Sequence, residues 1–202
     1  QMPAEAFGLN EEQQAFRAAA RDFADKELAP HAAQWDAEGH FPREAISKAA
    51  ELGFCGLYTA EDVGGLGMQR LDAAVVFEEL ATVDPSTSAF ISIHNMATWL
   101  IAAHATAAVR AHWGPLLTSG EKLASYCLTE PGAGSDAGSL KTRAVREGDE
   151  YVLDGSKAFI SGAGATDVLV VMARTGGEGP RGISAFVVPA DAPGITYGRK
   201  EE

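Results

Sequence analysis

The sequence predicts an α+β protein in which an all-helical N-terminal part precedes a part built from antiparallel strands. From Leu9 to Ser119 the chain is rich in alanine, and its apolar residues recur at helical spacing. Beyond Gly120 it is rich in Val, Ile, Thr and Gly, arranged in short runs between turn residues. We therefore expect a helical domain at residues 1–120 and an antiparallel, barrel-like β domain at residues 121–202.

Capping residues and prolines mark where the expected helices begin and end. Asn10 can cap a first helix whose apolar stripe continues to Leu28, and Pro30 stops that helix. A second helix is expected from Pro42 to Gly53, because proline suits a first turn and glycine follows a last one. Further helices are expected at 71–82, 86–104 and 106–117, with a glycine-rich loop at 59–68.

Strands are expected wherever the second part has a short apolar run between turn residues. Turns expected at 147–149 and 154–156 would divide one long segment into successive antiparallel strands, the last of them containing KAFIS at 157–161. Other strands are expected at 123–129, 167–175 and 182–190. Helices and strands do not alternate, which argues against a doubly wound nucleotide-binding fold.

Composition and charge exclude several classes of function. The chain has 202 residues, with 16 Lys plus Arg against 28 Asp plus Glu, and a formal net charge of −12. This charge repels phosphate and disfavours nucleic acid or an anionic membrane surface as a partner. No apolar run approaches the roughly 20 residues of a membrane span. The start of the chain carries no targeting pattern, so we expect a bacterial cytoplasmic protein, or a mitochondrial matrix protein if eukaryotic.

Cysteine and histidine give no disulfide or metal pattern. Cys55 and Cys127 form no CxxC pair, which fits a reducing compartment. Histidine occurs 5 times, scattered along the chain, and does not supply the three or four convergent ligands of a metal site. Cys127 lies within an expected strand with no histidine nearby in sequence, so we interpret it as a buried apolar residue rather than a nucleophile.

Two short segments carry the densest chemical signal: YCLTEPGAGSD at 126–136 and KAFISG at 157–162. The first runs from a strand into a loop whose glycines let backbone N–H groups approach an anion or a heteroaromatic ring. Taken singly, each has an ordinary structural interpretation. Pro and Gly after a strand usually mark only a turn, and Phe159 fits an aromatic residue packed in a sheet.

Together, the two segments resemble the flavin-binding signatures of the acyl-CoA dehydrogenase family, and the resemblance covers essentially the whole chain. The runs KAFISGAG, VVMARTGG and GISAFVV are most similar to the short branched-chain members of that family. The resemblance implies a helical N-terminal domain and a middle β domain that is incomplete here. The family's C-terminal helical bundle is absent from this chain.

The resemblance implies FAD as cofactor and assigns residues to it. The cofactor-binding residues would be Tyr126, Cys127, Leu128, Thr129, Gly134, Ser135, Phe159, Ile160 and Ser161. Ser135 would also contact the substrate, where FAD and the acyl-CoA meet. Many family members carry Trp and Thr where this chain has Phe159 and Ser161, a departure that bears on the subfamily and not on the cofactor. Fixed amide and hydroxyl donors suit a flavin that gains negative charge on reduction.

The implied reaction is α,β-dehydrogenation of an acyl-CoA, with electrons passed to an electron-transferring flavoprotein. The implied assembly is a homotetramer formed largely through the C-terminal domain. The family's catalytic base is a Glu in that domain, so we assign no catalytic residue here and expect the base beyond Glu202. Glu130 is interpreted as anchoring its loop. Two alternatives stay open: a non-catalytic flavin or acyl-CoA binding module, and a flavin oxidase or monooxygenase on the same scaffold.

Several other residues have both a structural and a functional interpretation. By resemblance, SIHNM at 92–96 approaches the acyl end of the substrate, although apolar residues at this spacing are more often core. Basic residues of the β part alternate with acidic ones and are expected at solvated sheet edges, where one could still pair with a CoA or FAD phosphate. These are Lys141, Arg143, Arg146, Lys157 and Arg174.

Overall fold

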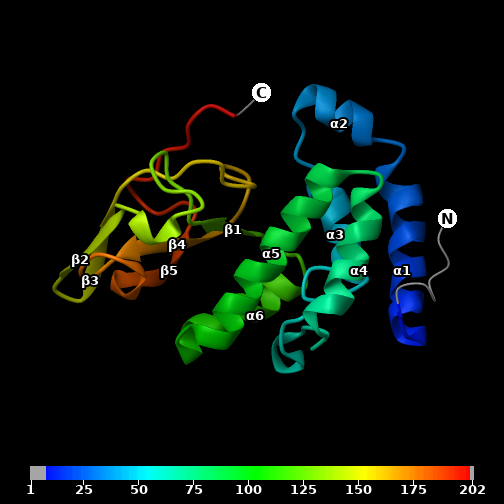
Figure 1. Cartoon of the computed structure of the whole chain (residues 1–202), viewed down its shortest axis with the longest axis horizontal. Coiled ribbons are helices and arrows are strands. Elements are labelled where there is room, and N and C mark those ends of the chain that lie inside the picture. Colours follow the sequence, from blue (N-terminus) through cyan, green and yellow to red (C-terminus); the bar gives the residue numbers. More distant parts are fainter. Residues whose placement is uncertain (1–7, 201–202) are drawn as a thin grey trace. The chain divides into compact units, whose positions relative to one another are not determined.

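The computed structural model describes residues 8–200 and divides the chain into two compact units, at residues 1–121 and 122–202 (Figure 1). The first is helical and the second is built on a sheet, which confirms the expected order of a helical part followed by a β part. Within the described residues, no helix combines the length and apolarity needed to cross a bilayer.

The helical unit is organised around its longest helix, α5. Successive packing of α1 on α4, α4 on α5 and α5 on α6 buries a common core. The helices are α1 (Glu11–Phe23), α2 (Ala32–Glu38), α3 (Arg43–Glu51), α4 (Arg70–Ala81), α5 (Pro85–His104) and α6 (Ala107–Thr118). The expected cap is confirmed: the Asn10 side chain accepts from the Gln13 amide at 2.8 Å, and Gln13 bonds back to the Asn10 amide at 3.0 Å.

Two local features of the helical unit differ from expectation. The first helix does reach Leu28, but its last turn is a π-helix, Ala24–Leu28. A short helix, α2, then occupies the stretch between the two prolines, where no helix was expected, and ends at Gly39 with φ +60°. None of its residues is buried, so it lacks the apolar stripe on which helical periodicity depends.

The second unit is a five-stranded mixed sheet centred on β4. The strands are β1 (Ala124–Cys127), β2 (Arg143–Glu147), β3 (Glu150–Asp154), β4 (Val168–Arg174) and β5 (Ile183–Pro189). β4 pairs parallel with β1 and antiparallel with β5, and β2 forms an antiparallel hairpin with β3. A single parallel pair, Arg143 with Arg174, joins that hairpin to β4.

The expectation of purely antiparallel strands is therefore wrong for β1 and β4. A parallel pair needs a long crossover to return the chain to the same end of the sheet. Here the crossover is residues 128–167, which contains the first chemical segment from Leu128 onward, the whole of the second and the β2–β3 hairpin. The expectation of a strand at 157–161 is also wrong, because that run has no regular secondary structure.

Candidate functional site

The two chemical segments, far apart in sequence, meet at the carboxyl end of β1. Tyr126 and Cys127 end that strand, and Thr129 follows it. The Ala158 amide donates to the Thr129 carbonyl at 2.9 Å. The Ser125 hydroxyl, fully buried, donates to the Ser161 carbonyl at 2.7 Å. The fold thus brings residues 126–129 and 157–161 together.

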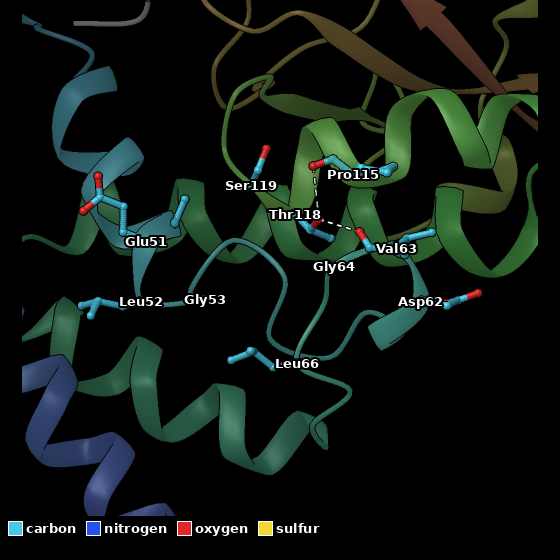
Figure 2. Close-up of a pocket in the computed structure, with 11 residues that line it drawn as sticks. Glu51, Leu52, Gly53, Asp62, Val63, Gly64, Leu66, Pro115, Thr118 and Ser119 are labelled. Atoms are coloured by element: carbon cyan, nitrogen blue, oxygen red, sulfur yellow. Dashed lines mark hydrogen bonds between the residues drawn. The ribbon is translucent and has the colours of Figure 1, made fainter.

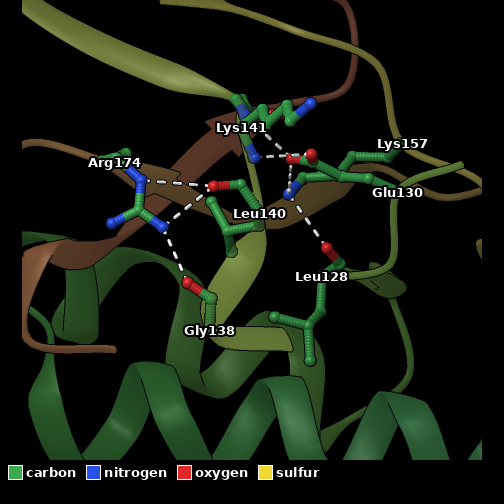
Figure 3. Close-up of polar contacts among 8 residues, drawn as sticks. Leu128, Glu130, Gly138, Leu140, Lys141, Lys157 and Arg174 are labelled. Atoms are coloured by element: carbon green, nitrogen blue, oxygen red, sulfur yellow. Dashed lines mark hydrogen bonds and ion pairs between the residues drawn. The ribbon is translucent and has the colours of Figure 1, made fainter. Parts of the chain in front are cut away.

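Glu130 and Lys157 form a buried ion pair between the same segments (Figure 3). Their side chains are 7% and 11% exposed, and the Lys157 Nζ lies 2.9 Å from the Glu130 Oε1. The carboxylate also accepts from the amides of Lys141 at 2.7 Å and Thr142 at 2.9 Å. Lys157 donates in addition to the Leu128 carbonyl at 3.0 Å. The pair therefore ties together three parts of the crossover: residues 128–130, residues 141–142 and Lys157.

Glu130 is held as a carboxylate. Burial alone would raise its pKa, but the donors from Thr142, Lys141 and Lys157 outweigh burial and lower the pKa to about 2. A carboxylate with so low a pKa and with its oxygens occupied is poorly suited to remove a proton from carbon. This geometry agrees with an anchoring role for Glu130 and not with a role as catalytic base.

Arg174 is a second anchor, at the end of β4. Its guanidinium donates to the carbonyls of Gly138 at 2.8 Å and Leu140 at 2.9 Å (Figure 3). It also donates to the carbonyl of Gly179 at 3.0 Å and to that of Gly177. The expectation that Lys157 and Arg174 lie at solvated sheet edges is wrong, because Lys157 is largely buried in an ion pair and Arg174 lies on the central strand and donates to four backbone carbonyl groups. The alternation of charges gave no sign of this, although Arg174 follows an apolar run and Lys157 precedes one.

Phe159 has an unusual backbone and an unusual exposure. Its φ is +55°, and among the described residues it is the one non-glycine residue with positive φ. Its side chain is 74% exposed, although it is a large apolar group. Strained backbone and an exposed aromatic ring together are typical of a functional position. The sheet-packing interpretation of Phe159 is therefore wrong.

The loop after β1 presents unoccupied donors and open space. Within residues 8–200, the amides of Leu128, Thr129, Gly134 and Ser135 donate no hydrogen bond. A Cβ added at Gly134 or at Gly132 would meet nothing within 4 Å, and neither residue has positive φ. Neither steric crowding nor backbone conformation therefore requires glycine at these positions. The lack of a side chain would instead let a ligand approach the backbone closely. These residues suit a flavin, whose ring offers acceptors along one edge.

The site residues are not all joined to one another. Gly134 and Ser135 lie in the exposed part of the loop, and within the described chain no hydrogen bond links them to residues 157–161. Cys127 is buried, as expected, and burial raises the pKa of its thiol to about 11, which disfavours the nucleophilic thiolate. No group of three or more potential metal ligands gathers anywhere in residues 8–200.

The polar residues of the SIHNM run serve the helical core. Asn95, fully buried, accepts from the Leu57 amide at 2.8 Å and donates to the Phe54 carbonyl at 2.7 Å. His94, also fully buried, bonds through Nε2 to the Leu117 carbonyl at 2.8 Å. These two side chains are therefore structural, and Ser92, Ile93 and Met96 remain half-buried.

A shallow open groove of about 560 Å³ lies in the helical unit (Figure 2). It runs between the end of α3, the loop around Val63 and the end of α6, where the Thr118 hydroxyl donates to the Val63 carbonyl at 2.7 Å. It includes the exposed side chains of Leu52 and Leu66. None of the expected site residues lines it.

Comparison with known proteins decides the family. Residues 10–121 match the model of the acyl-CoA dehydrogenase N-terminal domain, and residues 125–202 match that of the middle domain. The chain belongs to the acyl-CoA dehydrogenase family. It is similar to the mitochondrial isobutyryl-CoA dehydrogenase of Dictyostelium discoideum, with 54% identity over 100% of this chain and 49% of the relative. The expected resemblance to short branched-chain acyl-CoA dehydrogenases is thus confirmed.

Solved acyl-CoA dehydrogenase structures share the fold. Butyryl-CoA dehydrogenase from Megasphaera elsdenii is 36% identical with a TM-score of 0.87, over 96% of this chain and 52% of that one. An acyl-CoA dehydrogenase from Bacillus anthracis, complexed with FAD, is 28% identical with a TM-score of 0.84, over 96% of this chain and 33% of that one. The chain spans about half the length of the curated relatives it matches.

Proposed function

We propose that this chain forms the flavin-binding part of an FAD-dependent acyl-CoA dehydrogenase that acts on a short, branched acyl-CoA. The observation that carries the proposal is the meeting of residues 126–129 with residues 157–161, next to loop amides that donate no hydrogen bond within residues 8–200 and in the same segment as the exposed ring of Phe159. The relatives support the substrate class, because the similar protein of Dictyostelium discoideum is an isobutyryl-CoA dehydrogenase.

FAD would be held by the residues predicted from the sequence. The amides of Leu128, Thr129 and Ser135 would donate to acceptor atoms of the ring, and the ring of Phe159 would pack against its apolar portion. Tyr126, Cys127, Gly134, Ile160 and Ser161 would complete the binding surface. When bound, the flavin supplies a hydride acceptor. Ser135 would in addition face the thioester.

The chain's own contribution to the reaction is orientation and polarity. Donors fixed by the fold stabilise charge that appears on reduction, and they need no reorganisation when it appears. We assign the proton-abstracting carboxylate to a part of the protein beyond residue 202, since Glu130 is engaged by Lys157, Lys141 and Thr142. Electron transfer to an electron-transferring flavoprotein and a homotetrameric assembly belong to this proposal.

The first test is the visible spectrum of the anaerobic full-length enzyme, recorded before and after addition of isobutyryl-CoA, butyryl-CoA or octanoyl-CoA. We expect a bound flavin that is bleached fastest by isobutyryl-CoA. Neighbouring thioesters should still react, because one methylene in an apolar pocket changes selectivity by only about 1–3 kcal/mol. A full-length protein that binds no flavin would contradict the proposal. A flavin that no acyl-CoA bleaches would favour the non-catalytic module.

The second test locates the cofactor. Hydrogen exchange of the full-length protein with and without FAD should show protection at residues 126–135 and 157–161. The β2–β3 hairpin is the internal control, because its strand amides already bond one another. Protection confined to other segments would contradict the assigned residues while leaving FAD binding intact.

A further inference from the structure

Stability alone does not explain why the ion pair between Glu130 and Lys157 is buried. Its side chains are almost fully buried, and both groups are supplied with further partners. Replacing a buried ion pair by apolar residues of similar volume is often neutral or stabilising. A pair retained with this many directed bonds is therefore better explained by the geometry it enforces.

That geometry concerns the two peptide planes on either side of Thr129. Lys157 Nζ holds the Leu128 carbonyl at 3.0 Å, and the next residue, Ala158, holds the Thr129 carbonyl through its amide at 2.9 Å. Consecutive carbonyl groups of one segment are thus held by consecutive residues of the other. Neither peptide plane can rotate without breaking one of these bonds.

The consequence falls on the Thr129 amide. In a trans peptide the carbonyl and the following N–H point in opposite directions, and the described chain has no cis bond. Because Lys157 holds the Leu128 carbonyl, the Thr129 N–H points away from Lys157. It finds no acceptor within residues 8–200.

We infer that Glu130 and Lys157 are positioning residues for the flavin: the buried pair fixes the Leu128–Thr129 peptide so that the Thr129 N–H is presented to the ring. Glu130 acts at one remove, by holding the Lys157 ammonium between its own Oε1 and the Leu128 carbonyl. The inference rests on the proposed function and extends it to residues outside the assigned contacts.

The test uses the full-length enzyme, stripped of flavin and titrated with FAD while flavin fluorescence is recorded. Lys157→Met removes the donor to Leu128 and should weaken FAD binding about tenfold, the usual effect of losing a charge-assisted hydrogen bond. Glu130→Gln, which is nearly isosteric, should weaken it in the same direction. The double variant should bind no more weakly than the weaker single variant, because the two residues act as a unit.

A purely structural role is separated by the reduction potential and by a control variant. Reduced flavin carries more negative charge than oxidised flavin, so a misaligned N–H should lower the potential of Lys157→Met. Val168→Ala, in the buried start of β4, should lower the midpoint of thermal unfolding yet leave potential and affinity unchanged. If Lys157→Met does not fold, Glu130→Gln carries the same comparison.

Two outcomes would overturn the inference, and they are distinguishable. Wild-type enzyme that binds FAD, together with variants that match its affinity and potential within about twofold, would reject the positioning role and leave the proposed function intact. Wild-type enzyme that binds no FAD would reject both.

Discussion

Phe159 occupies a backbone conformation that only glycine adopts without strain. With φ +55°, its Cβ crowds the neighbouring carbonyl, at a cost of about 1–2 kcal/mol. The ring gains nothing from the fold in return, because it is 74% exposed. Backbone strain without compensating burial indicates that Phe159 contacts a ligand rather than the rest of the chain. The proposed flavin ring is such a ligand.

Replacing Phe159 with Gly should therefore separate stability from binding. Without FAD, Phe159→Gly should raise the free energy of unfolding by up to about 1 kcal/mol, because glycine adopts positive φ without strain. FAD affinity should fall, since the ring contact is lost. Urea unfolding and FAD titration would measure the two effects. Tyr151→Gly, in β3 with ordinary backbone, should instead lose stability. An equal loss of unfolding free energy in Phe159→Gly and Tyr151→Gly would contradict this account.

His94 is neutral inside the helical unit because burial opposes its charged form. Burial lowers its pKa from 6.5 to about 4, and its contact with the Leu117 carbonyl only partly opposes that shift. Between these pH values the unfolded chain binds a proton at this residue that the folded chain does not bind. Stability is therefore complete above pH 6.5 and is lost as the pH falls towards 4.

The expected slope is up to about 1.4 kcal/mol per pH unit in that range. Urea unfolding of the chain between pH 7.5 and 4, followed by helical circular dichroism, would measure it. In His94→Gln, which has no group that titrates there, the slope should become distinctly shallower. An identical slope in the variant would show that other groups cause the acid sensitivity. Glu130 makes a separate contribution to stability, because its pKa is lowered from 4.5 to about 2. That contribution is complete above pH 4.5 and is lost as the pH falls towards 2.

At the scale of elements, Asn95 joins α5 to the loop that follows α3. The Asn95 side chain accepts a hydrogen bond from the backbone amide of Leu57 and donates to the carbonyls of Phe54 and Ile91. One side chain thus fastens the loop to the central helix. Within residues 8–200, neither the Leu57 amide nor the Phe54 carbonyl bonds to another backbone group. A fully buried side chain satisfies polar groups that the fold would otherwise leave unpaired.

Asn95→Ala should consequently destabilise the helical unit by about 3 kcal/mol, because it leaves buried donor and acceptor groups without partners. Urea unfolding measures the change. Ser86→Ala, at an exposed position on the same helix, is the matched control and should stay within about 0.5 kcal/mol of the wild type. A small effect of Asn95→Ala would mean that water replaces the amide in the loop.

The whole molecule carries a charge far from zero, and this charge acts on both units at once. A net charge of −12 on 202 residues places many carboxylates within repulsive distance of one another. Several exposed ion pairs, such as Lys26 with Asp22 and Arg110 with Asp62, offset little of this repulsion, because surface pairs are weak.

Screening of this repulsion should stabilise the chain. Raising NaCl from about 10 mM to about 150 mM shortens the Debye length from roughly 30 Å to 8 Å, so the midpoint of thermal unfolding should rise. Scanning calorimetry at fixed pH would record the shift. Sucrose, which does not screen charge, provides the comparison for excluded-solute effects. A midpoint that falls steadily with salt would show that local ion pairs outweigh the net repulsion.

The sequence predicted most of what depends on local pattern. Helical periodicity, the Asn10 cap and proline punctuation located the main helices, and turn residues located the strands. It did not predict α2, whose residues bury no stripe, or the absence of a strand at 157–161. In the latter case an apolar run looks the same whether it pairs with another strand or leaves an aromatic side chain exposed on a strained backbone, as at Phe159.

The candidate residues themselves came from the sequence, because the contiguous motifs at 126–136 and 157–162 together resemble the flavin-binding signatures of the family. Only the tertiary structure decided that β1 and β4 pair in parallel, and that the crossover folds back on the end of β1. It alone revealed that Lys157 and Arg174 anchor that crossover, and it supplied the partners of Glu130, whose anchoring role the sequence had suggested. The reason is physical: a residue type limits which bonds a group can form, whereas which groups meet depends on contacts between residues far apart in the chain.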